Sequence, residues 1–348
     1  MKDRQAQRLA VLSVIISSIV VFTFFVVSKE EFVKLAEAKE TVTTFAGMSL
    51  YENLETIADE RRMEIEAELR QYLRVGLPDN IKESDVKMEA DYVKRSLKIE
   101  ISNVDPSYLD NSPIVGSCNH IVDMNWRYEA GKAYIELELD AASEYTVNYE
   151  NDQLVVKFIS PKEIYDKVIV VDAGHGGNHP GTNRNGILEK DITLDIILYL
   201  KELLDDSDIK VYYTREDDSN PSFDERVQLA NQMDADYFVS VHINADEHSR
   251  ESNGTEVLYY TADERSRKFA QLCTDKVSAV LNSRNRGISD GDSIYIVRNA
   301  KVPVALIEVG FISNNTEFHL LCSDSYKKKA AEGIYQAILE AYENKTEN

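Results

Sequence analysis

The chain has 348 residues, of which 43% are hydrophobic, enough for about two or three folded units with buried cores. Acidic residues outnumber basic ones by 61 to 39, which gives a formal net charge of -22. A chain this acidic lacks the cationic surface that nucleic-acid binding requires, so nucleic acid is excluded as a partner. The three cysteines, Cys118, Cys273 and Cys322, lack the close paired spacing of a thiolate metal site.

The amino terminus predicts a membrane anchor. Leu9 to Val27 is an uncharged, apolar run of 19 residues. As a helix it would cover roughly 28 Å, about the thickness of the hydrocarbon core of a bilayer. Lys2, Arg4 and Arg8 precede it, so the positive-inside rule keeps the short tail in the cytoplasm and places the rest outside. A cleaved signal peptide is the alternative, but charged residues separate the small-residue site Ala36–Ala38 from the apolar run.

The next two segments predict a linker and a small β-rich domain. Residues 29–83 are expected to form a charged helical linker, with a helix over Tyr51 to Leu73 that ends before Gly76. Residues 84–161 alternate apolar and polar side chains in several short stretches, as half-buried strands do. Turn residues at Glu129–Lys132 and Asn151–Asp152 predict hairpins between these strands.

Residues 162–348 predict an α/β domain. Short apolar strands alternate with helical segments, which is typical of a mostly parallel sheet with helices on both faces. The expected strands are Val168–Val171, Lys210–Thr214, Tyr237–Val241, Thr255–Tyr260 and Val304–Ile307, and the expected helices are Lys190–Leu204, Ser222–Gln232, Asp263–Leu281 and Tyr326–Tyr342. The predicted order is therefore a cytoplasmic tail and anchor (1–28), the linker, the β-rich domain and this α/β domain.

Three of the apolar strands are followed by residues suited to metal chemistry. His175 follows the first strand, His242 follows the third, and Glu308 follows the last. Because the carboxyl ends of parallel strands meet at one rim of a sheet, these side chains are expected to lie together, with Glu189 at a nearby helix start. Two imidazoles and one carboxylate are a common zinc set that leaves one position for water. A further carboxylate can take the proton of that water and deliver it to a leaving nitrogen.

In this order the motifs resemble those of the zinc-dependent N-acetylmuramoyl-L-alanine amidases, over about residues 167–343. The matching stretches are VVDAGHGG, PGT with NGILEKDITLDI, VYYTREDD with DERVQLAN, DADYFVSVHINAD, and VPVALIEVGFISNNTE. The resemblance implies one Zn²⁺ ion held by His175, Glu189 and His242, and Glu308 as the catalytic carboxylate. It also implies a peptidoglycan hydrolase that uses a zinc-activated water to cleave the amide bond between N-acetylmuramic acid and L-alanine of the stem peptide.

Some positions depart from the family pattern or stand beside it. Ala173 occupies a place where the family usually has proline, which a short turn tolerates. Some relatives carry an inserted helix that covers the metal, but only about eight residues separate Ala245 from Gly254, so this autoinhibition is not expected. Three further residues are candidate substrate contacts: Arg298, for a stem-peptide carboxylate, and His179 and Asn244 near the predicted metal. Asp172 is expected to hold the loop, to bind the outer nitrogen of a metal-ligating histidine, or to cap a turn.

Together these features predict a single-pass protein of the bacterial cell membrane whose catalytic domain faces the cell wall. The alternatives are another zinc peptidase or deacetylase acting on the wall, and a non-catalytic wall-binding scaffold. The helical and β-rich segments are candidate contacts for a protein activator or scaffold.

Overall fold

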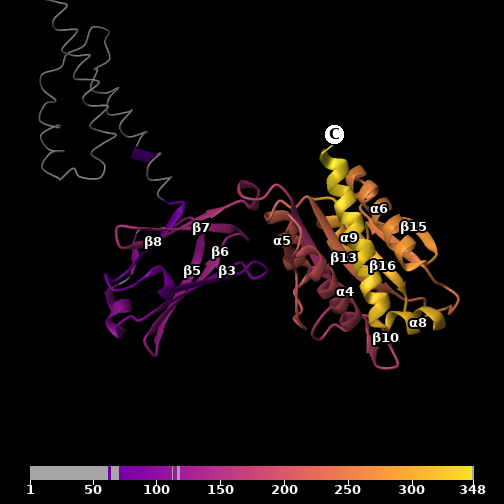
Figure 1. The fold of residues 1–348 in the computed structure, drawn as a ribbon, viewed down its shortest axis with the longest axis horizontal. Helices are drawn as coiled ribbons and strands as arrows, with labels where there is room; N and C mark the ends of the chain where they lie inside the picture. Colours follow the sequence, from indigo (N-terminus) through magenta and orange to yellow (C-terminus); the bar gives the residue numbers. More distant parts are fainter. Residues whose placement is uncertain (1–61, 64–69, 112, 116–117, 347–348) are drawn as a thin grey trace, which may run out of the picture. The chain divides into compact units, whose positions relative to one another are not determined.

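The structure is a computed structural model that describes residues 62–63, 70–111, 113–115 and 118–346 (Figure 1). Contacts divide the chain into two units, residues 1–69 and 70–348. Of the first unit only Arg62 and Met63 are described, and they are helical. The predicted anchor over Leu9–Val27 lies outside the described residues. Among the residues that are described, no helix is both long and apolar enough to cross a membrane.

The β-rich part of the second unit consists of two antiparallel four-stranded sheets. One sheet has the order β4 (Ile114–Val115), β1 (Tyr72–Gly76), β8 (Gln153–Ile159), β7 (Glu144–Glu150). The other has the order β2 (Val86–Asp91), β3 (Ser96–Ser102), β6 (Lys132–Leu139), β5 (Ile121–Glu129). Short 3-10 helices lie at Glu83–Asp85, Pro106–Asn111 and Pro161–Glu163. Alternate apolar residues of both sheets share one core, so the sheets pack as a sandwich.

Both predicted hairpin turns are confirmed, because their central residues have the left-handed backbone that tight hairpins require. Ala130 and Gly131 join β5 to β6 with φ of 50° and 81°, and Asn151 and Asp152 join β7 to β8 with φ of 49° and 56°. These turns fix the register of the strands that they join.

The predicted helix over Tyr51–Leu73 is wrong at its carboxyl end and lies mainly outside the described residues. Tyr72 and Leu73 belong to strand β1, which lies within residues 29–83, the stretch expected to be a linker. This strand pairs with β8 of the β-rich part. The physical reason is alternation: Leu73 and Val75 point into the sandwich core and are almost completely buried, while the residues between them are less buried.

The α/β part is built on a six-stranded mixed sheet. Its order is β12 (Lys210–Tyr213), β9 (Val168–Ala173), β13 (Tyr237–Asn244), β16 (Val304–Phe311), β14 (Thr255–Tyr259), β15 (Asn285–Asp290). All neighbouring pairs of this sheet are parallel except β14 with β16, which is antiparallel. The predicted α/β class is thus confirmed, with a mixed sheet. Strand β15 was not predicted.

Helices cover both faces of this sheet, as expected (Figure 1). Residues of α4 (Glu189–Leu204), α6 (Glu264–Leu281) and α9 (Asp324–Thr346) share one core with alternate strand residues such as Ile169 and Val171. Residues of α5 (Phe223–Gln232) and α7 (Tyr295–Asn299) share the opposite core with Val168 and Val170. Helix α8 (Asn315–Leu321) follows β16, and a small hairpin of β10 (Asn183–Arg184) and β11 (Ile187–Leu188) precedes α4.

Candidate metal centre

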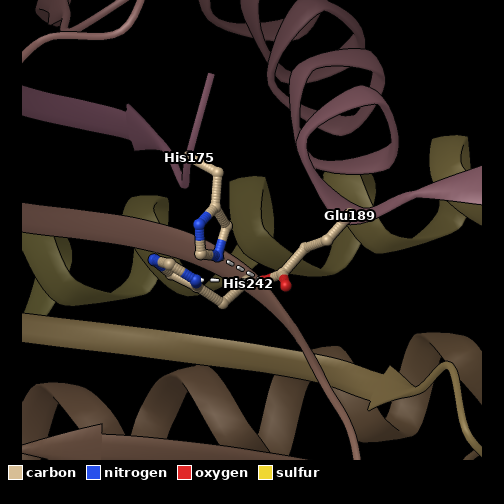
Figure 2. Close-up of side chains that lie close together, drawn as sticks. All are labelled: His175, Glu189 and His242. Atoms are coloured by element: carbon tan, nitrogen blue, oxygen red, sulfur yellow. Dashed lines mark hydrogen bonds and ion pairs between the residues drawn. The ribbon is translucent and has the colours of Figure 1, made fainter. Parts of the chain in front are cut away.

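The structure brings three of the predicted residues together at the rim of the mixed sheet. His175 lies in the loop after β9, Glu189 is the first residue of α4, and His242 lies near the end of β13. Figure 2 shows both imidazoles and the carboxylate turned toward one another. One Oε of Glu189 lies 3.0 Å from Nε2 of His175 and 3.1 Å from Nδ1 of His242. The potential ligand atoms of the three residues all lie within 4.8 Å of one another.

Two glycines allow this close approach. A Cβ atom on Gly174 would lie only 2.5 to 2.8 Å from three ring atoms of His242. A Cβ atom on Gly181 would lie 2.5 Å from Oε2 of Glu189 and 2.7 Å from a ring carbon of His175, and Gly181 also has φ of +67°. Any side chain at either position would therefore push a proposed ligand out of place.

The Glu189 carboxylate is held as an anion although it is only 3% exposed. One oxygen accepts hydrogen bonds from the backbone and side chain of Thr182, at 2.8 and 3.1 Å. The other accepts from the backbone N–H of Ile243 at 2.9 Å. Burial alone would raise the pKa of Glu189, but hydrogen bonds and charge from His175 and His242 outweigh it and lower that pKa below its usual range. A buried anion is thus available to a cation at neutral pH.

Glu308 lies beside this group because of the strand register. It pairs with His242 of β13 on one side and with Glu256 of β14 on the other. Its Oε2 atom is buried and has no hydrogen-bond partner in the part of the chain that the structure describes. Burial raises the pKa of Glu308 well above its usual range, and the negative charges of Glu189 and Glu256 raise it further. A buried carboxylate without a partner is costly, so this side chain fits a site that gains a ligand and water.

Within the part of the chain that the structure describes, the side chains of the other predicted contacts form no hydrogen bond or ion pair with this group. The His179 side chain is exposed, and its backbone N–H and carbonyl are paired with Gly176. Asn244 is the last residue of β13 and is partly buried. Arg298 is exposed on α7, where its guanidinium donates to the carbonyl of Asp292 at 3.2 Å. Contact of these three with substrate stays a prediction. The loop 245–254 contains no helix.

Two buried arginines were missed by the sequence analysis. Arg215 and Arg226 are 3% and 2% exposed, and both donate to backbone carbonyls of the loop that bears His175. Asp172, which was expected to hold the loop, binds Arg226 at 2.5 Å and is thereby linked to the loop, because Arg226 donates to the carbonyls of Ala173 and His175. One sequence feature could have indicated Arg226: it adjoins the apolar residues that α5 buries, where a charged side chain needs a partner.

The donor set fits a divalent transition metal. Two imidazoles and one carboxylate, with space kept open by glycines, match the ligands of zinc sites that retain an open position. The Oε2 atom of Glu308, which has no hydrogen-bond partner among the described residues, places a further carboxylate beside these three residues. The arrangement is therefore suited to hydrolysis of an amide or ester.

Comparisons with known proteins agree with this chemistry. Residues 169–340 match the family model described as N-acetylmuramoyl-L-alanine amidase. A Bacillus subtilis protein, the uncharacterized protein YqiI, is 34% identical over 183 residues, which cover 52% of this chain and 87% of that protein. The germination-specific N-acetylmuramoyl-L-alanine amidase of Bacillus subtilis is 32% identical over 193 residues, covering 51% of this chain and 81% of that protein. The crystal structure of an N-acetylmuramoyl-L-alanine amidase from Clostridium difficile 630 superposes with a TM-score of 0.49 at 32% identity, covering 51% of this chain and 97% of that one.

The matched segment contains every residue of the candidate metal centre together with Glu308. The similarity extends over most of the length of the two relatives from Bacillus subtilis. On this evidence the chain belongs to the family of N-acetylmuramoyl-L-alanine amidases.

Proposed function

We propose that this peptidoglycan amidase cleaves the bond between the lactyl group of N-acetylmuramic acid and L-alanine with one zinc ion held by His175, Glu189 and His242. The observation that supports the proposal is the convergence of their three ligand atoms within 4.8 Å, beside Glu308, whose buried Oε2 atom has no hydrogen-bond partner among the described residues. When bound, zinc supplies a Lewis acid that makes water more acidic and polarises a carbonyl.

Glu189 and Glu308 have different roles in the proposed reaction. Glu189 is the anionic ligand, because its pKa is lowered although it is buried. Glu308 takes the proton of the attacking water and returns it to the leaving nitrogen of L-alanine. Its position supports this role, since the strand register sets it beside His242 and its Oε2 atom has no hydrogen-bond partner within the described ranges.

The proposed function includes a location at the cell membrane. The apolar run Leu9–Val27, preceded by basic residues, would hold the chain in the bacterial cell membrane by a single span, with the catalytic domain facing the wall. This fits the substrate, because an enzyme tethered at the outer face meets peptidoglycan directly. A protein activator or scaffold would bind through the helical and β-rich segments. Fractionation of cells that express residues 1–348 or residues 29–348 tests the anchor: only the longer chain should stay with the membrane after a high-salt wash.

The chemistry is tested by metal analysis and product masses together. Residues 29–348 should bind about one zinc ion per chain and release intact stem peptides from purified peptidoglycan. Glu308→Gln should keep the metal but lower kcat by about 10²- to 10⁴-fold, the usual contribution of a general base. Glu332→Gln, the same substitution at an exposed position of α9, is the matched control and should be fully active.

Other products would decide against the proposal. Cut peptides would indicate a peptidase, lost acetyl groups would indicate a deacetylase, and an absence of any product would favour a wall-binding scaffold. Full activity of Glu308→Gln would show that another group is the base.

A further inference from the structure

The loop that bears His175 is held by two buried guanidinium groups. Arg226 donates to the carbonyl oxygens of Ala173 at 2.7 Å and His175 at 2.6 Å. Arg215 donates to the carbonyl oxygens of Ala173 and Gly174, each at 2.9 Å. Three consecutive carbonyls, at the end of β9 and in the loop after it, are therefore bound by two cationic side chains. Burying two like charges side by side is costly, so this arrangement needs compensation from its partners.

Asp172 supplies the negative charge. It is fully buried and accepts hydrogen bonds from Arg226 at 2.5 Å, from the Thr214 hydroxyl at 2.6 Å and from the Ser240 hydroxyl at 2.5 Å. Burial alone would raise the pKa of Asp172, but the charge of Arg226 and these hydrogen bonds lower it, so the residue stays ionised. Ser240 lies two residues before His242 on the same face of β13. The network thus connects the strand of one proposed ligand to the loop of the other.

The backbone of His175 explains why its loop needs such support. Its φ is +63°, a left-handed conformation that is unfavourable for a residue with a side chain. Such a conformation persists only where the surrounding structure fixes it, and it occurs preferentially at functional sites. The His175 carbonyl is fixed by Arg226, and the following turn is closed by paired hydrogen bonds between Gly176 and His179.

We propose that Arg226, braced by Asp172, is a positioning residue that holds His175 in its left-handed conformation and thereby aims the imidazole at Glu189 and His242. The link to metal binding rests on the proposed function, but the conformational part does not. Arginine suits the task because its planar fork reaches one carboxylate and three carbonyls at once, including that of Pro221 at 2.9 Å. Lysine keeps the charge for Asp172 but has no fork with which to reach all these acceptors.

The test is Arg226→Lys, with two readouts on the full chain. In the metal-free protein, the amides of Gly176 and His179 should exchange with solvent at least about tenfold faster than in the wild type, because their turn loses its support. The dissociation constant for Zn²⁺ should rise by about 10- to 100-fold, as is usual when a residue that orients a metal ligand is changed. At saturating Zn²⁺ the KM for peptidoglycan should be unchanged, and the visible spectrum of the Co²⁺-loaded variant should differ from that of the wild type.

A control separates positioning from general stability. Ile334→Ala removes buried side-chain volume from α9 in the core on the opposite face of the sheet, so it should lower the melting temperature but leave exchange and Zn²⁺ affinity within about twofold of wild type. If Arg226→Lys does not fold, Ser240→Ala, which removes one hydrogen bond from Asp172, should shift both readouts in the same direction by about threefold. Wild-type exchange and affinity in the folded Arg226 variant, or equal shifts in the control, would overturn the proposal. A wild type that binds no Zn²⁺ would refute the proposed function instead, and the exchange rates would still decide the role of Arg226.

Discussion

Replacing Gly174 by alanine should disable the metal centre by displacing His242. The new Cβ atom would lie 2.5 Å from Cε1, 2.6 Å from Nε2 and 2.8 Å from Nδ1 of the imidazole, whereas ordinary contacts begin near 3.4 Å. The ring must therefore move by about 0.9 Å, the difference between 3.4 and 2.5 Å, or the backbone of β9 must give way. Metal–ligand distances tolerate only about 0.2 Å, so such a shift should lower Zn²⁺ affinity by at least about tenfold. A misplacement of about 1 Å also costs about 10²-fold in rate.

The assay compares kcat/KM on purified peptidoglycan and the Zn²⁺ dissociation constant in Gly174→Ala and in Gly76→Ala. Gly76 is a matched control, because a Cβ atom there would meet only the carbonyl of Pro113, at 3.5 Å. We expect a fall in kcat/KM of about 10²-fold for the first variant and less than about twofold for the second. Unchanged activity and affinity in Gly174→Ala would refute the close packing on which the metal centre depends.

Three other predictions concern the cation, the substrate and the fold. Removing metal with a chelator should abolish activity and lower the melting temperature. Adding Zn²⁺ at about 100 times its dissociation constant should restore both, because binding at that concentration stabilises the folded protein by about 2.7 kcal/mol. Activity that survives chelation would contradict this prediction. Arg298→Ala should raise KM by about tenfold or more at unchanged kcat if its guanidinium binds a stem-peptide carboxylate, and an unchanged KM would remove it from the substrate site. Burial raises the pKa of Asp236, but hydrogen bonds from Lys162, Lys345 and the Val168 N–H outweigh it and lower that pKa. The stabilisation of the fold by ionised Asp236 is therefore fully present above the pKa of about 3.9 in the unfolded chain, and it is lost as the pH falls through the lower pKa in the folded protein. The free energy of unfolding measured in urea should be lower in Asp236→Asn than in the wild type by about 1–3 kcal/mol at pH 7, and by less near pH 3. A difference that grows as the pH falls would show that the pKa of Asp236 is raised on folding, not lowered.

The elements with strong periodicity could be predicted from the sequence, and those defined by their partners could not. The strand Val168–Val171 and the helices around Glu189 and Phe269 follow from apolar runs and helical spacing. Strand β15, by contrast, contains Asn285, Gly287 and Asp290, which individually disfavour strands, and it is extended because it pairs with β14. Tertiary pairing likewise decides the conformation of Tyr72 and Leu73.

The residues of the candidate site fall into the same two groups, those that the sequence predicts and those that it does not. His175, Glu189, His242 and Glu308 could be predicted because each follows an apolar strand or begins a helix, where chemistry gathers in α/β sheets. The residues that hold these side chains in place could not be predicted. Arg226 adjoins the buried stripe of α5, and nothing in the neighbouring sequence shows that its partners are Asp172 and the His175 carbonyl, 54 and 51 residues earlier in the chain.

The order of the strands decides the site more than any single motif does. His242 and Glu308 are distant in sequence and become neighbours because β13 pairs directly with β16 in parallel register. If β14 lay between these strands, two strand spacings, about 9–10 Å, would separate the residues, and Glu308 would be too far away for its proposed role as the base. The same motifs would then still supply three ligands, but without an adjacent acid. Apolar runs mark where each strand ends, whereas the strand neighbours are pairings between segments far apart in the chain. The proposed mechanism therefore depends on the sheet order, because only the position of β16 beside β13 brings Glu308 next to His242.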